Sequence, residues 1–157
     1  MTEKTCCVTG HREIPTEQMA RVRQALFREV RRAYEDGYRI FLSGFADGAD
    51  QLFAEAVSML RRQHPEVRLM AVIPFPARER SLRRRPRAAY LLAQCQEVIV
   101  TGERYLSSAY RVRNQYLVEH AGRVIAVYDG RSRGGTASTV RMAQRAAREI
   151  VFLPLLP

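Results

Sequence analysis

Short apolar runs alternate along this chain with longer stretches in which apolar residues recur every three or four positions. The short runs have the length and spacing of buried strands, and the longer stretches have the period of amphipathic helices. Strands are predicted at residues 5–9, 38–43, 67–73, 97–101, 123–128 and 150–153. Helices are predicted at residues 16–36, 49–63, 77–94, 107–121 and 136–148, with Pro86 interrupting the third of them.

Regular alternation of strand and helix favours a parallel sheet with helices on both faces. Because strand–helix–strand crossovers are right-handed, few topologies remain, and the doubly wound order is the leading one. We therefore expect an α/β protein, a Rossmann-like three-layer αβα fold with a mainly parallel sheet of about six strands. The chain has 157 residues with no internal repeat or linker, so one domain over residues 1–157 is expected.

Apolar and cysteine patterns indicate where the protein works and which chemistry it lacks. No apolar run approaches the length of a membrane span, and residues 1–5 carry no export signal, so we expect a cytoplasmic protein without membrane contact. The three cysteines form no CxxC pair, and Cys6 and Cys7 fall inside the first apolar run, which is typical of structural thiols. The histidines form no ligand-spaced cluster with them. Neither a metal nor a cofactor is predicted.

The formal net charge of +10 favours anionic partners, either phosphorylated small molecules or nucleic acid. Of the 26 basic residues, 25 are Arg, a skew that a GC-rich coding sequence also produces. Six of these arginines lie between residues 78 and 87. Such a run is typically a solvated face, and contact with a ligand or with a nucleic-acid backbone is the alternative.

Three glycine-bearing loops follow strands at the carboxyl edge of the predicted sheet, the edge at which open α/β folds bind ligands. These loops are residues 9–12, 43–50 and 129–136. Glycine lets a phosphate approach backbone N–H groups at a helix N-terminus, so the loops together predict a site for a phosphate-bearing ligand. The candidate binding residues are Gly10, His11, Arg12, Ser43, Gly44, Gly48, Asp50, Arg113, Asn114, Asp129, Gly134, Gly135 and Thr136.

Several of these side chains also have a purely structural interpretation. Arg113 either grips a phosphate with two parallel hydrogen bonds or is an ordinary exposed helical arginine. Asp50 either satisfies free N–H groups in the first turn of its helix or contacts a ribose or base. Asp129 is expected to hold a ribose hydroxyl. His11 either donates to a phosphate or base, or only packs in its turn.

The candidate loops resemble a known group of proteins, the SLOG superfamily. The resemblance rests on residues 43–50, 54–56, 113–114, 128–130 and 134–136. That superfamily includes the LONELY GUY nucleoside-monophosphate hydrolases and the DprA/Smf DNA-processing proteins. Residues 8–12 and 73–75 look most like its YpsA-like branch, whose biochemical role is poorly defined. The resemblance covers nearly the whole chain and implies a nucleotide-binding domain that forms homo-oligomers.

The LONELY GUY motif is matched only in part. That family pairs an Arg-Lys on one helix with a Gly-Gly-x-Gly-Thr-x-x-Glu loop, in which the Arg holds phosphate and the Glu is a key catalytic carboxylate. By resemblance, Arg113 matches the Arg, Asn114 stands where the Lys would be, and Gly135-Thr136 matches the Gly-Thr. The Glu position is Thr139, whose hydroxyl cannot replace a carboxylate. No catalytic residue is assigned, and cleavage would need another acid such as Glu13, Asp50 or Asp129.

A sensor-type domain that binds a nucleotide or nucleotide-derived phosphate ligand is therefore the leading hypothesis. A nucleoside 5′-monophosphate phosphoribohydrolase-like enzyme is one alternative. A module that binds single-stranded DNA is the other. Nucleic acid is the less favoured partner because the chain has no Trp and its other aromatic residues fall mostly in core-like positions.

Overall fold

The computed structural model describes residues 4–156, in which strands and helices alternate as expected. The strands are β1 (Thr5–Gly10), β2 (Ile40–Ser43), β3 (Arg68–Ile73), β4 (Glu97–Val100), β5 (Arg123–Tyr128) and β6 (Glu149–Pro154). The helices are α1 (Thr16–Glu35), α2 (Ala49–Gln63), α3 (Pro76–Arg83), α4 (Pro86–Ala93), α5 (Ala109–His120) and α6 (Gly135–Arg145). Residues 1–3, on which the expected lack of an export signal partly rests, lie outside this range. Within residues 4–156, no helix combines the length and apolar character that crossing a membrane requires.

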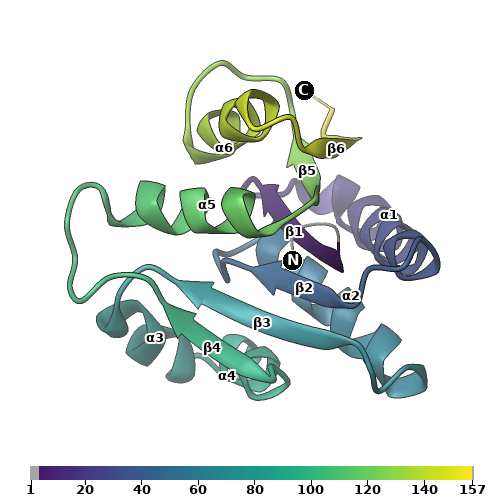
Figure 1. Cartoon of the computed structure of the whole chain (residues 1–157), viewed down its shortest axis with the longest axis horizontal. Helices are drawn as coiled ribbons and strands as arrows, with labels where there is room; N and C mark the ends of the chain where they lie inside the picture. Colours follow the sequence, from purple (N-terminus) through teal and green to yellow (C-terminus); the bar gives the residue numbers. More distant parts are fainter. Residues whose placement is uncertain (1–3, 157) are drawn as a thin grey trace.

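The six strands form one all-parallel sheet with the order β4-β3-β2-β1-β5-β6 (Figure 1). The chain starts at β1 in the middle, adds β2, β3 and β4 on one side, and then places β5 and β6 on the other. In the central register, Cys7 of β1 lies opposite Leu42 of β2 and Val124 of β5. The strand order thus reverses between β1 and β5. The predicted Rossmann-like three-layer fold is confirmed.

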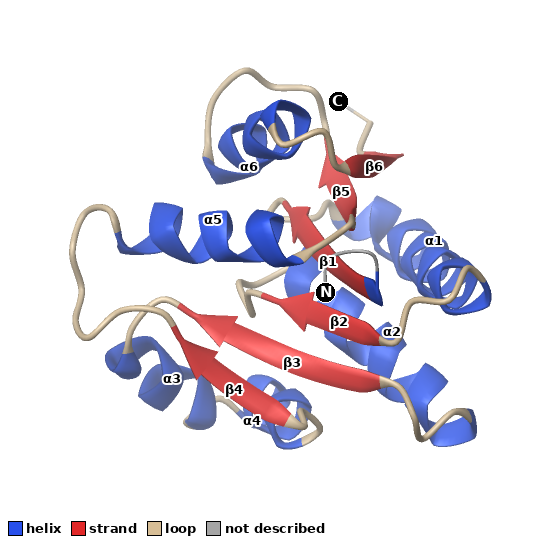
Figure 2. Ribbon diagram, viewed as in Figure 1, coloured by secondary structure: helices blue, strands red, loops and turns tan. Residues whose placement is uncertain are grey.

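Helices cover both faces of the sheet, with α1 to α4 on one face and α5 and α6 on the other (Figure 2). Successive strand residues point to opposite faces, so Cys6 packs in the core under α1 to α4 and Cys7 in the core under α5 and α6. Both thiols are fully buried, and this burial raises the pKa of each well above its ordinary value. Buried, neutral thiols fit the structural role expected from the sequence.

The predicted helix at residues 77–94 is two shorter helices, α3 and α4. Proline has no N–H to donate inside a helix, and its ring clashes with the preceding turn. Pro86 accordingly stands at the start of α4, and Arg85 before it has an extended backbone with φ −103° and ψ 121°. Leu82 of α3 and Leu91 of α4 still pack in the same core.

The loops that follow β1 and β2 pack directly against each other at the carboxyl edge of the sheet. The N–H of Ala49 donates to the carbonyl of His11 at 3.2 Å. A side chain on Gly10 would overlap the Cβ of Ala49, and one on Gly48 would lie 2.5 Å from the carbonyl oxygens of His11 and Arg12. Gly48 also has a φ of 76°, a backbone conformation that favours glycine. These two glycines let α2 begin immediately beside the end of β1.

Candidate functional site

The loops after β1, β2 and β5 meet α5 around a small cavity of about 80 Å³. It is lined by Val8, Thr9, Gly10, Arg12, Ala46, Asp50, Tyr110, Arg113, Asn114, Leu117, Gly135 and Thr136. Seven of these twelve residues are among the candidates chosen from the sequence, so packing brings most of the predicted site together. The volume equals that of about three water molecules, which suits a phosphate-sized group and excludes a nucleoside.

Arg113 is buried in the wall of this cavity, with 4% of its surface exposed. Its Nη1 donates to the carbonyl oxygens of Gly44 at 2.6 Å and Val72 at 3.3 Å, and its Nε donates to Asn114 Oδ1 at 2.8 Å. The remaining nitrogen, Nη2, has no hydrogen-bond partner among residues 4–156 and is not sealed from solvent. Two nitrogens of the guanidinium are therefore fixed by protein acceptors, and the third has none among residues 4–156.

Asp50 lines the same cavity from the first turn of α2. Its Oδ2 accepts the N–H of Ala46 at 3.1 Å, and its position in the helix suits the helix dipole. Burial raises the pKa of Asp50 to about 6, although Arg113 and the Ala46 N–H favour the charged form. The Asp50 carboxyl group thus accepts a hydrogen bond within the protein and also lines the cavity, and its pKa of about 6 lies just below neutral pH.

Ser43 and Gly44 lie behind the cavity and position the residues that line it. The Ser43 hydroxyl donates to the carbonyl of Asp50 at 2.9 Å and accepts the N–H of Phe45 at 3.2 Å. A side chain on Gly44 would lie 2.7 Å from Nη1 of Arg113. With Gly48, which serves the contact between loops, these candidates support the cavity and do not line it.

The N-terminus of α6 supplies free backbone N–H groups at the cavity. The first hydrogen bond of this helix runs from the N–H of Ser138 to the carbonyl of Gly134, at 3.0 Å. The N–H groups before it have no partner within a helix, and the helix dipole adds positive potential there. A side chain on Gly134 or Gly135 would meet no atom within 4 Å, so the space in front of this turn is open. Such an arrangement is typical of anion-binding helix N-termini.

Thr139, at the position of the LONELY GUY catalytic Glu, faces away from this space. Its side chain is fully buried and its hydroxyl donates to the carbonyl of Gly135 at 2.8 Å, one turn back in α6. A threonine hydroxyl commonly makes this bond inside a helix. Thr139 therefore has a structural partner and does not line the cavity.

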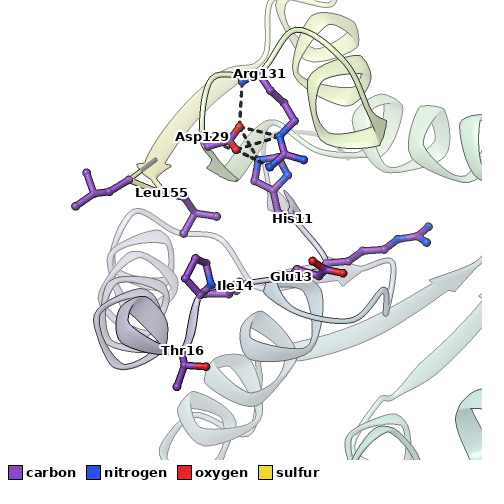
Figure 3. Close-up of a pocket in the computed structure, with 10 residues that line it drawn as sticks. His11, Glu13, Ile14, Thr16, Asp129, Arg131 and Leu155 are labelled. Carbon is purple, nitrogen blue, oxygen red and sulfur yellow. Dashed lines mark hydrogen bonds and ion pairs between the residues drawn. The ribbon is translucent and has the colours of Figure 1, made fainter.

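A larger cavity has a volume of about 690 Å³, and Arg12 lines both this cavity and the small one. Its walls come from the loop after β1, the loop after β5 and the C-terminal segment after β6 (Figure 3). The lining residues are His11, Arg12, Glu13, Ile14, Pro15, Thr16, Asp129, Arg131, Leu155 and Leu156. Gly130 and Gly134, in the loop after β5, line neither cavity.

His11, Asp129 and Arg131 form a connected cluster at one end of the larger cavity (Figure 3). Nε2 of His11 lies 3.1 Å from both the backbone nitrogen and Oδ1 of Asp129. Arg131 donates to Oδ2 of Asp129 from Nε at 3.0 Å and from Nη2 at 2.6 Å. Burial lowers the pKa of His11, whereas the hydrogen bonds from Arg131 hold the pKa of Asp129 far below its usual range. Burial thus favours the uncharged imidazole of His11, and the Asp129 carboxylate is engaged by Arg131.

Two side chains at the cavities were missed by the sequence reasoning. Tyr110 has its ring centroid 5.3 Å from Cζ of Arg12 and 5.5 Å from Cζ of Arg113, close enough to attract both cations. Its spacing of three residues from Arg113 on a predicted helix was a usable signal, because such residues share a face. Arg131 gave no comparable signal, since its partner Asp129 was considered only as a ligand contact. Among residues 4–156, no three His, Cys, Asp or Glu side chains cluster closely enough to hold a metal ion.

The basic run at residues 78–87 is paired in part with three acidic neighbours. Its ion pairs are Arg78–Asp47, Arg83–Glu79, Arg85–Asp47 and Arg87–Glu55. Arg78 also donates to the carbonyl of Phe45 at 3.1 Å, which ties α3 to the loop after β2. Four of the six arginines thus have a carboxylate partner, as expected for a solvated face.

Comparison with known proteins relates the chain to a family. The YpsA family model, described as the YspA SLOG family, matches residues 6–153. YoqJ, an uncharacterized SPbeta prophage-derived protein of Bacillus subtilis (strain 168), is 28% identical over 125 residues, covering 71% of this chain and 72% of YoqJ. A UPF0398 protein of Bacillus cereus (strain G9842) is 26% identical over 128 residues, covering 79% of this chain and 70% of that protein. The resemblance to the SLOG superfamily and its YpsA-like branch is confirmed.

Two solved structures share the fold. DNA processing protein A from Helicobacter pylori, whose structure was described for its single-stranded DNA binding mode, has a TM-score of 0.68 at 18% identity, covering 98% of this chain and 66% of that one. The X-ray structure of TM1055 has a TM-score of 0.60 at 16% identity, covering 94% of this chain and 72% of that one. At such identities the likeness shows the fold alone.

Proposed function

The chain belongs to the YspA SLOG family, and we propose that it binds the phosphate group of a nucleotide or nucleotide-derived ligand in the small cavity. The observation that carries this proposal is the convergence of Arg113, Asn114, Gly135 and Thr136 on one phosphate-sized space. These residues lie on two segments that are distant in the sequence. Arg113 and Gly135-Thr136 match positions of the LONELY GUY motif, whereas Asn114 replaces its Lys.

The electrostatics of the cavity favour an anion. Nη2 of Arg113 is free to donate, Arg12 also lines the cavity, and the N-terminus of α6 adds its N–H groups. Charge-assisted hydrogen bonds of this kind are roughly twice as strong as neutral ones. Asp50 opposes the anion once it ionises, because its pKa is about 6. Phosphate affinity should therefore be limited by Asp50 above that pH.

Binding without cleavage is supported by Thr139, because its hydroxyl is buried in α6 and bonded to Gly135. A phosphoribohydrolase needs a carboxyl group beside the glycosidic bond. Asp50 and Asp129 are committed to the Ala46 N–H and to Arg131, and Glu13 lies at the larger cavity. Within residues 4–156, a threonine hydroxyl thus takes the position of the missing catalytic Glu, and Asp50 on α2 is the carboxyl group that lines the small cavity.

Thermal denaturation and calorimetry with inorganic phosphate and adenosine 5′-monophosphate test the proposal. At a ligand concentration of 100 times Kd, binding should stabilise the folded state by about 2.7 kcal/mol. Chromatography of the same mixtures should detect no free adenine. Release of adenine at a rate that depends on protein concentration would make this chain an enzyme and overturn the binding-only function.

Gly135→Ala gives a clean variant for this test. The added Cβ meets no protein atom within 4 Å, so the fold tolerates it, and it enlarges a residue that lines the small cavity beside the N–H groups of α6. Phosphate affinity should fall about tenfold, or 1.4 kcal/mol, with the melting temperature of the free protein unchanged. Arg145→Ala, at the exposed far end of α6, removes a positive charge as the matched control. Equal phosphate affinities for Gly135→Ala and the unmodified protein would contradict the proposed position.

Binding of single-stranded DNA is a second candidate, favoured by the fold shared with Helicobacter pylori DNA processing protein A. The pairing of four of the six arginines of the basic run with Asp47, Glu79 and Glu55 weakens it, although Asp47 serves two of them and the other two have no carboxylate partner among residues 4–156. Fluorescence anisotropy of a labelled thymidine oligonucleotide at 50 and 200 mM salt separates the two candidates. DNA binding that falls steeply with salt and is not displaced by adenosine monophosphate would replace the nucleotide proposal.

A further inference from the structure

We infer that the larger cavity is the subsite for the nucleoside part of a ribonucleotide whose phosphate lies in the small cavity. This inference rests on the proposed function, because it takes the position of the phosphate as given. A space of about 80 Å³ holds little more than the phosphate, so the rest of the ligand must lie outside it. The cavity of about 690 Å³ shares Arg12 with it as a lining residue and has an ordinary volume for a small-molecule site.

One wall of the larger cavity is apolar and fixed in place. It consists of Ile14, Pro15, Leu155 and Leu156. Ile14 and Leu155 are buried, and the C-terminal segment is held to α1 by Gln18. The Gln18 side chain donates to the carbonyl of Leu156 and accepts its N–H, each at 3.0 Å. A nucleobase can pack its flat face against such a wall, and no entropy is lost in ordering the wall because it is already held in place.

Next to this wall, Glu13 lines the cavity with a carboxylate that has no hydrogen-bond partner among residues 4–156. Within residues 4–156, no donor is hydrogen-bonded to Glu13, whereas Asp129 is taken up by Arg131. In Figure 3, Glu13 lies between the cluster around His11 and the apolar residue Ile14. An ionised carboxylate only accepts hydrogen bonds, so it attracts hydroxyl groups and repels a second phosphate. The two hydroxyl groups of a ribose are donors that suit a cavity with a carboxylate beside an apolar wall for the base.

Recognition of ribose by Glu13 has a measurable signature. A carboxylate that accepts from the 2′-hydroxyl group loses this partner when the ligand is a deoxyribonucleotide. Adenosine 5′-monophosphate should therefore bind about tenfold more tightly than its 2′-deoxy analogue. It should also bind about tenfold more tightly than ribose 5-phosphate, which has no base to pack on the apolar wall.

Calorimetry with four probes tests the assignment. The probes are inorganic phosphate, ribose 5-phosphate, adenosine 5′-monophosphate and its 2′-deoxy analogue. Glu13→Ala changes an exposed side chain and should abolish the preference for ribose over deoxyribose while leaving phosphate affinity unchanged. Leu156→Ser should weaken both nucleotides about threefold or more and leave ribose 5-phosphate unaffected. Glu17→Ala, which removes an exposed carboxylate of α1 outside the cavity, is the matched control and should behave as the unmodified protein.

The outcomes separate this inference from the proposed function. If phosphate and all three organic phosphates fail to bind, the proposed function is wrong and the inference falls with it. If phosphate binds but adenosine monophosphate binds no more tightly, the small cavity stands and the nucleoside subsite is overturned. A ribose preference that persists in Glu13→Ala also overturns the subsite.

Discussion

Two buried arginines lie at opposite ends of the sheet and differ in how their charge is balanced. Arg123, at the amino end of β5, donates to carboxylate oxygens of Asp36 at 2.8 Å and Glu149 at 3.0 Å. Its Cζ also lies 4.7 Å from the ring centroid of Tyr38. Arg113, at the carboxyl end, is held by two backbone carbonyls and the Asn114 amide. Both side chains are almost inaccessible to solvent.

The difference in partners sets the electrostatics of each end. Burial lowers the pKa of both arginines, but at Arg123 the hydrogen bonds to Asp36 and Glu149 outweigh it and the pKa is raised. At Arg113 burial prevails over the charge of Asp50 and the pKa is lowered. A buried cation without a bonded carboxylate gains from any anion that enters its cavity. Two carboxylates therefore balance the cation at the amino end, although Nη1 of Arg123 is buried there without a hydrogen-bond partner, whereas no carboxylate is bonded to the arginine at the carboxyl end within residues 4–156.

The largest expected effect is the loss of ligand binding in Arg113→Met. Removing charge-assisted hydrogen bonds to a phosphate should cost about 3 kcal/mol, or more than a hundredfold in affinity for adenosine monophosphate by calorimetry. Arg113→Lys keeps the charge but not the planar fork and should recover only part of the affinity. Circular dichroism controls for folding of both variants. Affinity within threefold of the unmodified protein would show that Arg113 is not needed for binding, so that the two arginines do not differ in function.

The next effect is a pH dependence of stability carried by Asp50. Its pKa is about 6 in the folded protein against an ordinary 3.8, so between these values only the unfolded state is ionised. The free energy of unfolding should therefore fall as the pH rises from 4 to 6, by on the order of 3 kcal/mol, and stay lower above it.

Asp50→Asn cannot ionise, so its stability should stay level over that range and exceed that of the unmodified protein at pH 7.5. Urea denaturation at pH 4.5 and 7.5 measures both. The amide can still accept the Ala46 N–H, and phosphate should bind more tightly at pH 7.5 because a negative charge is gone. Parallel pH profiles for the two proteins would show that Asp50 is not the group that titrates.

Arg123→Met should have a smaller effect, confined to stability. Asp36 and Glu149 are 46% and 53% exposed, so water can solvate them once their partner is removed. We expect a loss of about 1–2 kcal/mol in the free energy of unfolding, measured in urea, with the affinity for adenosine monophosphate unchanged. Weakened nucleotide binding at this distance from the cavity would break the distinction between the two ends.

The smallest effect is expected at Arg85, an arginine of the exposed run. Both Arg85 and its partner Asp47 are about half exposed, and such pairs contribute less than about 1 kcal/mol. Arg85→Ala should change neither the melting temperature by more than a few degrees nor the affinity for nucleotide. A clear loss of oligonucleotide binding in this variant would instead favour the DNA-binding candidate.

Most of the architecture was predictable because it follows from local patterns. Apolar runs and helical periodicity located all six strands, and the interruption expected at Pro86 divides one predicted helix into α3 and α4. Arg113, Asn114, Gly135 and Thr136 were found through motif spacing, which is also local. Ser43, Gly44 and Gly48 were chosen by the same reasoning, but they lie behind the cavity. The two glycines leave room for neighbouring atoms to pack closely, and the Ser43 hydroxyl bonds to the backbone of α2.

By itself, the sequence determined the alternation of strands and helices, the SLOG resemblance and the two segments that carry the phosphate-binding pattern. Only the tertiary structure decided which arginines are paired, how the space at the carboxyl edge divides into two cavities, and that Glu13 is left without a donor among residues 4–156. Periodicity records which residues are buried within one element. Ion pairs such as Arg123–Asp36, and cavities walled by Ile14 and Leu155, join residues far apart in the chain, so they exist only once the elements have packed.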